Sequence, residues 1–113
     1  MAAPYSTTVD GFENQFGTNH LGPFLFTNLI RPKLVKNVRV VNVSSWGHNL
    51  SPVLFDDVGF AKGATYDKWK AYGQAKTANM LFSVGLRRRW EGVEAFSLHP
   101  GGEIVIGCTS CGL

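Results

Sequence analysis

Hydrophobic side chains recur at steps of three and four residues along the first third of the chain, which favours a helix over residues 10–34. Gly17, Gly22 and Pro23 interrupt this pattern, so we expect the helix to be bent or broken between residues 18 and 23. The positions that form the recurring stripe are Phe12, Phe16, His20, Phe24 and Thr27.

A second helical pattern covers residues 68–90, which are rich in alanine, lysine, glutamine, leucine and methionine. Two β-branched segments, residues 39–45 and 93–99, predict strands before and after this helix. The first strand is apolar at Val40 and Val41 in succession, which is typical of a strand covered on both faces. One face of the predicted helix carries Tyr72, Ala75, Asn79, Phe82 and Leu86.

The order of these elements predicts the fold class. A strand, a crossing connection with a helix, and a second strand form a β-α-β unit, whose strands should pair in parallel through a right-handed connection. Residues 46–67 contain the glycines and prolines typical of a loop, with room for one short helical turn. We therefore expect an α/β fold: one β-α-β unit of a doubly wound parallel sheet, preceded by a broken helix.

Length and composition narrow the class of protein. A chain of 113 residues suits one domain, and a hydrophobic content of 44% argues against intrinsic disorder. Two cysteines exclude a disulfide-dense secreted scaffold. No apolar run approaches the roughly 20 residues of a membrane-spanning helix, and the first residues lack the basic-then-apolar pattern of a signal peptide. We expect a soluble protein of the cytoplasm.

The distribution of charge along the chain bears on nucleic-acid binding. Eleven lysines and arginines against eight aspartates and glutamates give a net charge of +3. The dense basic run, residues 87–89, falls where the second helix is predicted to end, and the helix dipole favours cations there. We therefore predict no nucleic-acid binding.

Tyr72 and Lys76 stand four residues apart in the predicted helix, so they share one face with their β-carbons about 5–6 Å apart. An ammonium close to a phenol stabilises the phenolate, which brings a tyrosine into the range of general acid–base chemistry. Taken alone, the pair is better explained as an exposed lysine beside an amphipathic tyrosine.

Two serines, Ser44 and Ser45, end the first predicted strand on its carboxyl side, where open α/β sheets bind their ligands. Ser45 can donate a hydrogen bond to a substrate carbonyl oxygen while Tyr72 supplies a proton. The alternative is that both serines satisfy the turn after the strand, which is a common arrangement.

Four longer segments contain these residues and further motif positions: DGFENQFGTNHLG at residues 10–22, RVVNVSS at 39–45, AYGQAKTANMLF at 71–82 and SLHPG at 97–101. Over residues 7–101 their order and spacing resemble the short-chain dehydrogenase/reductase family, in particular its retinol-dehydrogenase-like and WW-domain-oxidoreductase-like branch. The resemblance implies a Rossmann-like sheet and an oxidoreductase. Such an enzyme transfers a hydride between NAD(P) and an alcohol or carbonyl substrate, which in this branch is retinol- or steroid-like.

The resemblance also implies a role for each of four residues. Asn19 is similar to the asparagine that holds a water in the family's proton relay. Ser45 is similar to the serine that orients the substrate carbonyl or hydroxyl, and Tyr72 to the acid/base. Lys76 is similar to the lysine that stabilises the phenolate and binds the nicotinamide ribose.

Cofactor contacts and a partner follow from the same resemblance. NAD(P) would be held by Tyr72 and Lys76, and by Pro100 and Gly101, which match the family's Pro-Gly turn near the nicotinamide. The two long helices commonly pack across a dimer in this family, so a homodimer through them is implied. Hydride transfer would be the chemistry of the cofactor, and the protein would supply position and protons.

Other parts of the family pattern are absent from the sequence. This branch opens with a T-G-x-x-x-G-x-G phosphate loop and continues to N-N-A-G, and neither occurs here. We therefore expect residues 1–101 to be the catalytic part of a truncated domain that lacks its first cofactor-binding strands, with weak NAD(P) binding. The alternative function is a non-catalytic fragment, or an interaction or dimerisation piece.

Residues 102–113 do not match the family and are predicted to form a divergent tail. Cys108 and Cys111 give a formal C-x-x-C, but a structural zinc site needs four ligands and a redox motif stands at the start of a helix. We expect an unstructured tail with reduced thiols and no metal site.

Overall fold

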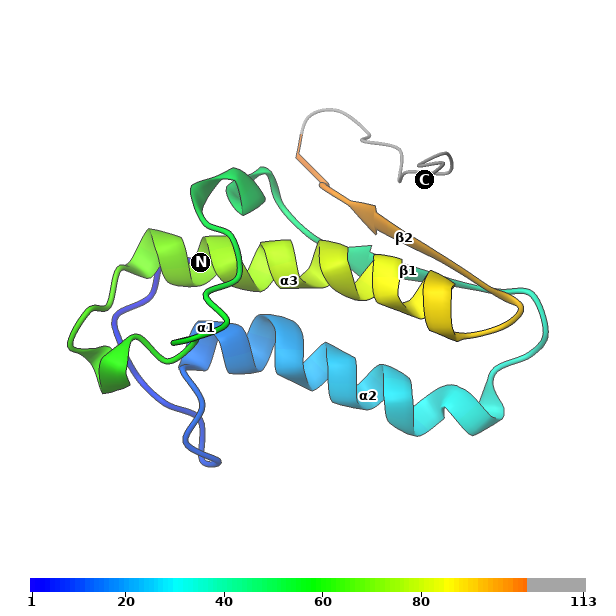
Figure 1. Ribbon diagram of the computed structural model, residues 1–113, viewed down its shortest axis with the longest axis horizontal. Coiled ribbons are helices and arrows are strands. Elements are labelled where there is room, and N and C mark those ends of the chain that lie inside the picture. Colours follow the sequence, from blue (N-terminus) through cyan, green and yellow to red (C-terminus); the bar gives the residue numbers. More distant parts are fainter. Residues whose placement is uncertain (102–113) are drawn as a thin grey trace.

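A two-stranded parallel sheet packs against a long helix in the computed structural model, and a second helical segment lies alongside that helix (Figure 1). The structure describes residues 1–101. The sheet consists of β1 (Val38–Val43) and β2 (Val93–Leu98), which are connected through α3 (Lys68–Arg89). This arrangement confirms the predicted β-α-β unit and its parallel pairing.

The two strands are in register from end to end, with Val38 opposite Val93 and Val43 opposite Leu98. Both strands therefore end at the same edge of the sheet. β1 is shorter than predicted, because regular pairing stops at Val43. The N–H of Ser44 still donates to the carbonyl oxygen of Leu98 at 2.8 Å, so the chain leaves the sheet only after this residue.

The prediction that β1 is covered on both faces is wrong for the described residues. Val41 and Val43 are 50% and 51% exposed. Successive side chains of a strand point to opposite faces, and α3 covers only the face that carries Val40. On that face, Val40 packs against a buried cluster from α3 and β2 and the turn between them, formed by Phe82, Leu86, Trp90 and Ala95.

The first helical segment is continuous, but its hydrogen bonding changes along its length. The predicted interruption takes the form of a π-helix, a wider turn in which the N–H of Gly22 reaches back five residues to the carbonyl oxygen of Gly17. Phe16 packs there against Ala75 and Ala78 of α3. The parts of the segment are α1 (Asn14–Phe16), the π-helix η1 (Gly17–Leu21), α2 (Gly22–Ile30) and the 3-10 turn η2 (Arg31–Lys33).

This segment begins later than the pattern predicts. The carboxylate of Glu13 caps it by accepting from the N–H groups of Gln15 and Phe16 at 2.8 and 2.7 Å. Just before the cap, Gly11 has a φ of +84°, a left-handed conformation that does not continue into a helix. Phe12 therefore lies in a turn, where it is half exposed.

α3 matches its predicted span to within one residue. The side chain of Asp67 caps its first turn by accepting from the N–H groups of Trp69 and Lys70. Gly92, with a φ of +72°, turns the chain from the end of the helix into β2. The predicted stripe is confirmed: Tyr72 is half-buried, and the other members are buried, namely Ala75, Asn79, Phe82 and Leu86.

The connection from β1 to α3 holds two short 3-10 helices, η3 (Trp46–Leu50) and η4 (Ala61–Gly63), where the sequence predicts one helical turn. η3 packs against α3 next to the end of β1. It therefore shapes the edge of the sheet at which the predicted site residues gather.

No helix within residues 1–101 is long and apolar enough to cross a membrane. The predicted tail with Cys108 and Cys111 lies outside the described residues.

Candidate active site

The carboxyl end of β1 brings two serines against α3. Ser44 is buried, and its hydroxyl donates to the carbonyl oxygen of Lys76 at 2.8 Å, which ties the strand end to the helix. Ser45 caps η3, where its Oγ accepts from the N–H of Gly47 at 3.1 Å. Of the two serines, only Ser45 serves the turn after the strand, since the hydroxyl of Ser44 bonds to α3. Accepting that bond still leaves the hydroxyl hydrogen of Ser45 to donate to a ligand.

η3 brings Ser45 beside the ring of Tyr72. A β-carbon placed on Gly47 would lie 2.6 Å from Cε1 of Tyr72 and 3.4 Å from Oγ of Ser45. On the facing helix, a β-carbon on Gly73 would lie 2.9 Å from the carbonyl oxygen of Gly47. The two glycines therefore permit a close approach of η3 to α3, and this approach keeps the serine hydroxyl and the tyrosine ring next to each other.

Lys76 follows Tyr72 by one helical turn, and its ammonium nitrogen lies 5.6 Å from the centroid of the tyrosine ring. The ammonium donates to the carbonyl oxygen of Val43, the last residue of β1, at 3.2 Å. Lys76 is half-buried and is anchored to the strand end rather than extended into solvent. The structure thus brings together the tyrosine, the lysine and the serine that the sequence predicts.

Asn19 lies in the middle of the π-helix and is half-buried. In an α-helix its carbonyl oxygen would accept from the N–H four residues later, but that residue is Pro23, which has no N–H. Instead, Nδ2 of Asn79 on α3 donates to this carbonyl at 3.0 Å. Asn19 is therefore connected to the site through its backbone.

Two residues at this junction, Asn79 and His20, are not predicted as site residues. Oδ1 of Asn79 lies 3.0 Å from Nδ1 of His20. Since Nδ2 of Asn79 donates to carbonyl groups, Oδ1 is the acceptor and Nδ1 of His20 carries the hydrogen. The signal in the sequence is an asparagine within an apolar stripe, because a buried amide must find hydrogen-bond partners.

His20 is enclosed by the rings of Phe16, Phe24 and Phe82, whose centroids lie 5.1, 6.0 and 6.2 Å from that of the imidazole. Burial lowers the pKa of His20 below its ordinary value of 6.5, while the hydrogen bond with Asn79 acts in the opposite direction. The neutral form of His20 is therefore favoured by its surroundings.

Pro100 and Gly101 follow β2, whose end is in register with the end of β1. Both are exposed and lie at the same edge of the sheet as Ser45. The N–H of Gly101 faces Nδ1 of His99 at 3.4 Å, and a β-carbon on Gly101 would lie 2.6 Å from the His99 ring. The Pro-Gly turn is thus shaped by its own histidine and follows the strand end that pairs with the end of β1.

The donors at this edge fit one part of NAD(P), the nicotinamide ribose. An ammonium has three N–H donors, and Lys76 uses one of them on Val43, so two donors remain for hydroxyl groups of a ligand. The hydroxyl of Tyr72 is a second polar group on the same face of α3. The pyrophosphate of the cofactor has no such match, because the sequence contains no glycine-rich phosphate loop.

Comparison with known proteins places this edge in context. No family model matches the chain. The chain is 45% identical over 105 residues to retinol dehydrogenase 12 of Mus musculus and to retinol dehydrogenase 11 of Homo sapiens. It is 42% identical over 110 residues to the short-chain dehydrogenase/reductase prx1 of Penicillium roqueforti. These alignments cover 89 to 90% of this chain and 32 to 33% of the relatives, so the chain spans about a third of their length.

A solved structure shows the same relationship. The crystal structure of an uncharacterized protein from Mycobacterium paratuberculosis superposes with a TM-score of 0.82 at 44% sequence identity, over 93% of this chain and 40% of that one. The predicted resemblance to the short-chain dehydrogenases/reductases and their retinol dehydrogenases is confirmed. The fold is a partial Rossmann-like α/β arrangement, as predicted.

Proposed function

We propose that the edge of the sheet around Ser45, Tyr72 and Lys76 is the acid–base part of an NAD(P)-dependent oxidoreductase centre of the short-chain dehydrogenase type. The observation that carries this proposal is the close approach of η3 to α3 at Gly47. It puts a serine hydroxyl beside a tyrosine ring that has a lysine ammonium 5.6 Å from its centroid. A hydrogen-bond donor, a phenol and a cation are the groups needed to protonate a carbonyl oxygen.

Each of these side chains has a distinct task in the proposed reaction. In the reductive direction, Tyr72 gives its hydroxyl proton to the carbonyl oxygen of the substrate, and Ser45 donates a hydrogen bond to the same oxygen. When bound, NAD(P)H supplies the hydride to the carbonyl carbon. The phenolate that remains on Tyr72 is stabilised by the ammonium of Lys76. In the oxidative direction, this phenolate accepts the proton of the alcohol.

The backbone of Asn19 supports a route by which the tyrosine regains its proton. A carbonyl oxygen has two lone pairs, and Asn79 uses one of those on Asn19. A water molecule bound to the second lone pair would lie at the π-helix, opposite the end of β1 to which Lys76 is bonded. Such a water can pass protons between solvent and the site.

The substrate class we propose is an apolar alcohol or aldehyde, such as a retinoid or a steroid. The proposal draws on the names of the similar proteins, several of which are retinol dehydrogenases.

An exchange of segments tests this function. Residues 7–101 would replace the aligned segment of one of the retinol dehydrogenases, which supplies its own phosphate loop. We expect NADPH-dependent reduction of retinal by the hybrid, and a loss of about 10²–10⁴-fold on Tyr72→Phe, the usual contribution of a general acid. Equal activity with and without the Tyr72 hydroxyl would contradict the proposal.

A second candidate function, an interaction or dimerisation piece, is favoured by an apolar groove between α2 and α3. The groove has a volume of about 370 Å³ and is lined mainly by apolar side chains, among them Phe24, Phe55, Phe82 and Trp90. Two of its walls are α2 and α3, the helices that the family resemblance associates with dimers, and the loop with Phe55 forms a third. An uncovered apolar surface of this kind marks an interaction site.

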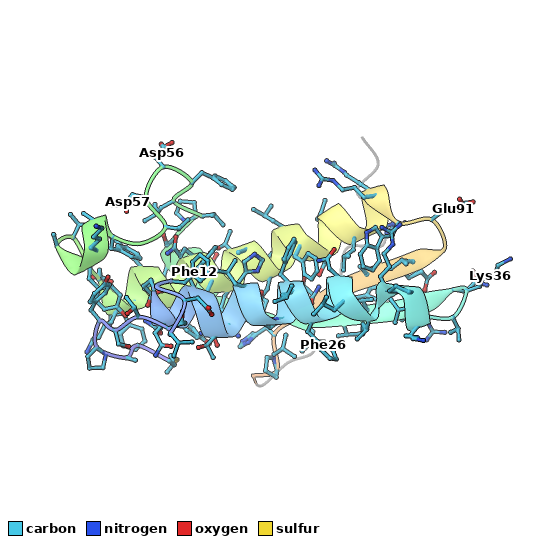
Figure 2. All side chains as sticks on the ribbon, turned by 90° about the horizontal axis from the view of Figure 1, so that it is seen from below. Phe12, Phe26, Lys36, Asp56, Asp57 and Glu91 are labelled. Carbon is cyan, nitrogen blue, oxygen red and sulfur yellow. The ribbon has the colours of Figure 1, made fainter. Side chains whose placement is uncertain are left out.

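Sedimentation equilibrium distinguishes this second candidate. We expect a dimer that Phe24→Asp disrupts. Phe26→Asp is the matched control, because Phe26 is 62% exposed on the side of α2 opposite the loop that carries Asp56 and Asp57 (Figure 2). A monomeric wild-type chain, or equal effects of the two substitutions, would contradict a dimer through the groove.

A further inference from the structure

One buried side chain, that of Asn79, connects α3 to the π-helix and to the end of β1 beside the proposed site. Asn79 is 5% exposed and lies on α3, three residues after Lys76. Its Nδ2 donates to the carbonyl oxygen of Asn19 in the π-helix at 3.0 Å and to that of Val43 at the end of β1 at 3.2 Å. Both hydrogens of the amide are thereby used.

The two carbonyl groups depend on this amide in different ways. The carbonyl of Asn19 has no α-helical partner, because Pro23 has no N–H. The carbonyl of Val43 is shared, since it accepts from the ammonium of Lys76 as well as from Asn79, each at 3.2 Å. Both carbonyl groups accept from the same amide, so the π-helix and the strand end are linked through Asn79, and Lys76 is linked to them through its own bond to Val43.

The acceptor half of the same side chain has a separate partner. Oδ1 accepts from Nδ1 of His20 at 3.0 Å, and His20 in turn packs among three phenylalanine rings. Because donor and acceptor contacts go to different groups, substitutions can remove one half and keep the other.

We propose that Asn79 is a positioning residue of the site. Its two N–H donors hold the carbonyl groups of Asn19 and Val43 together, and this fixes the π-helix and the ammonium of Lys76 relative to the serine and the tyrosine. The catalytic meaning of this role rests on the proposed function, whereas the geometry can be tested without turnover.

The test uses the isotope-labelled 113-residue chain, observed by NMR without substrate. Asn79→Asp keeps the size and the acceptor but removes both donors. We expect amide exchange in residues 17–22, in Phe24 and in residues 43–45 to become about tenfold faster, the scale of one lost hydrogen bond. We also expect the side-chain resonances of Lys76 to shift. In this variant the carbonyl of Val43 loses its bond from Asn79 and keeps only the bond from the Lys76 ammonium.

Two further variants make the result specific. His20→Phe removes the partner of Oδ1 and keeps both amide donors, so exchange at Asn19 and Val43 should stay within about twofold of the wild-type rate. Asn28→Asp is the matched control, because Nδ2 of Asn28 donates at 2.7 Å to the carbonyl of Phe24 in its own helix.

The proposal is overturned if Asn79→Asp has no more effect than Asn28→Asp, or if His20→Phe reproduces it. Should Asn79→Asp fail to fold, as judged by circular dichroism, Asn79→Ser is measured instead. A serine hydroxyl has one donor, so at least one of the carbonyl groups of Asn19 and Val43 must lose its bond. The comparisons with Asn28→Asp and His20→Phe then test the proposal in the same way. If the hybrid enzyme shows no turnover that depends on Tyr72, only the proposed function is contradicted. The positioning role of Asn79 would still stand, because none of these NMR signals requires turnover.

Discussion

The ring of Tyr72 lies directly against the backbone of Gly47. A β-carbon at position 47 would be 2.6 Å from Cε1 and 2.9 Å from Cδ1 of the tyrosine, distances that real β-carbons essentially never show. The residue at this position therefore decides where the tyrosine stands relative to Ser45, although it contributes no side chain to the site.

We expect Gly47→Ala to displace the ring of Tyr72 and to destabilise the chain by about 1–3 kcal/mol, the usual cost of overpacking. Urea unfolding measures the stability, and the ring resonances of Tyr72 report the displacement. Gly59→Ala is the matched control, because a β-carbon on Gly59 has no neighbour within 4 Å. Equal effects of the two substitutions would show that the contact has no consequence.

Two further glycines, both in α3, should respond in opposite directions. A β-carbon on Gly85 meets nothing within 4 Å, so Gly85→Ala should stabilise the helix by about 0.5–1 kcal/mol. Gly73→Ala should destabilise the chain, because its β-carbon would lie 2.9 Å from the backbone of both Gly47 and Ser51. Thermal unfolding of both variants measures the change in melting temperature. A change of the same sign in the two variants would contradict the prediction.

His20 should make the fold less stable in mild acid. Its lowered pKa means that the folded chain binds this proton less readily than the unfolded chain does. The corresponding stability is complete above pH 6.5, is lost as the pH falls below that value, and stops changing below the folded-state pKa. NMR titration of His20 should give a midpoint under 6.5, and His20→Gln should flatten the pH dependence of unfolding in this range. A midpoint at or above 6.5 contradicts the burial argument.

Cofactor binding by the 113-residue chain should be weak. The ammonium of Lys76 can serve the nicotinamide ribose, but the sequence offers no glycine-rich loop whose N–H groups would bind the pyrophosphate. Titration of NADPH fluorescence measures the affinity, with Lys76→Met as the variant that should weaken it further. Binding at micromolar concentration would show that other residues hold the phosphates.

The β-α-β unit could be predicted because its signals are local. Asp67 and Gly92 mark the ends of α3 through capping and a left-handed φ, and both effects depend on residues within one turn of the helix end. The positions of Ser45, Tyr72 and Lys76 followed from this unit and from the family resemblance. In the structure, Lys76 lies 5.6 Å from the centroid of the Tyr72 ring, and a β-carbon on Gly47 would approach both that ring and Oγ of Ser45.

The contacts that sequence patterns missed are tertiary. A stripe at steps of three and four does not distinguish an α-helix from one that contains a π turn, and the partner of the Asn19 carbonyl is 60 residues away in the chain. The coverage of Val41 and Val43 likewise depends on what packs against the sheet, which two consecutive valines do not specify.

The π-helix also determines how the chain would respond to a change in length. An α-helix turns about 100° per residue, so eight residues would set Phe24 about 80° away from Phe16 around the axis. Both rings contact His20, which is four residues from each of them, and the π turn takes up one residue, which reduces the angle between the two rings. Deleting exposed Thr18 would remove the additional residue, and Pro23 would then lie in the interior of a regular helix, where its ring clashes with the carbonyl four residues earlier. We therefore expect this deletion to kink the helix at Pro23 and to remove the hydrogen bond between the Asn19 carbonyl and Asn79.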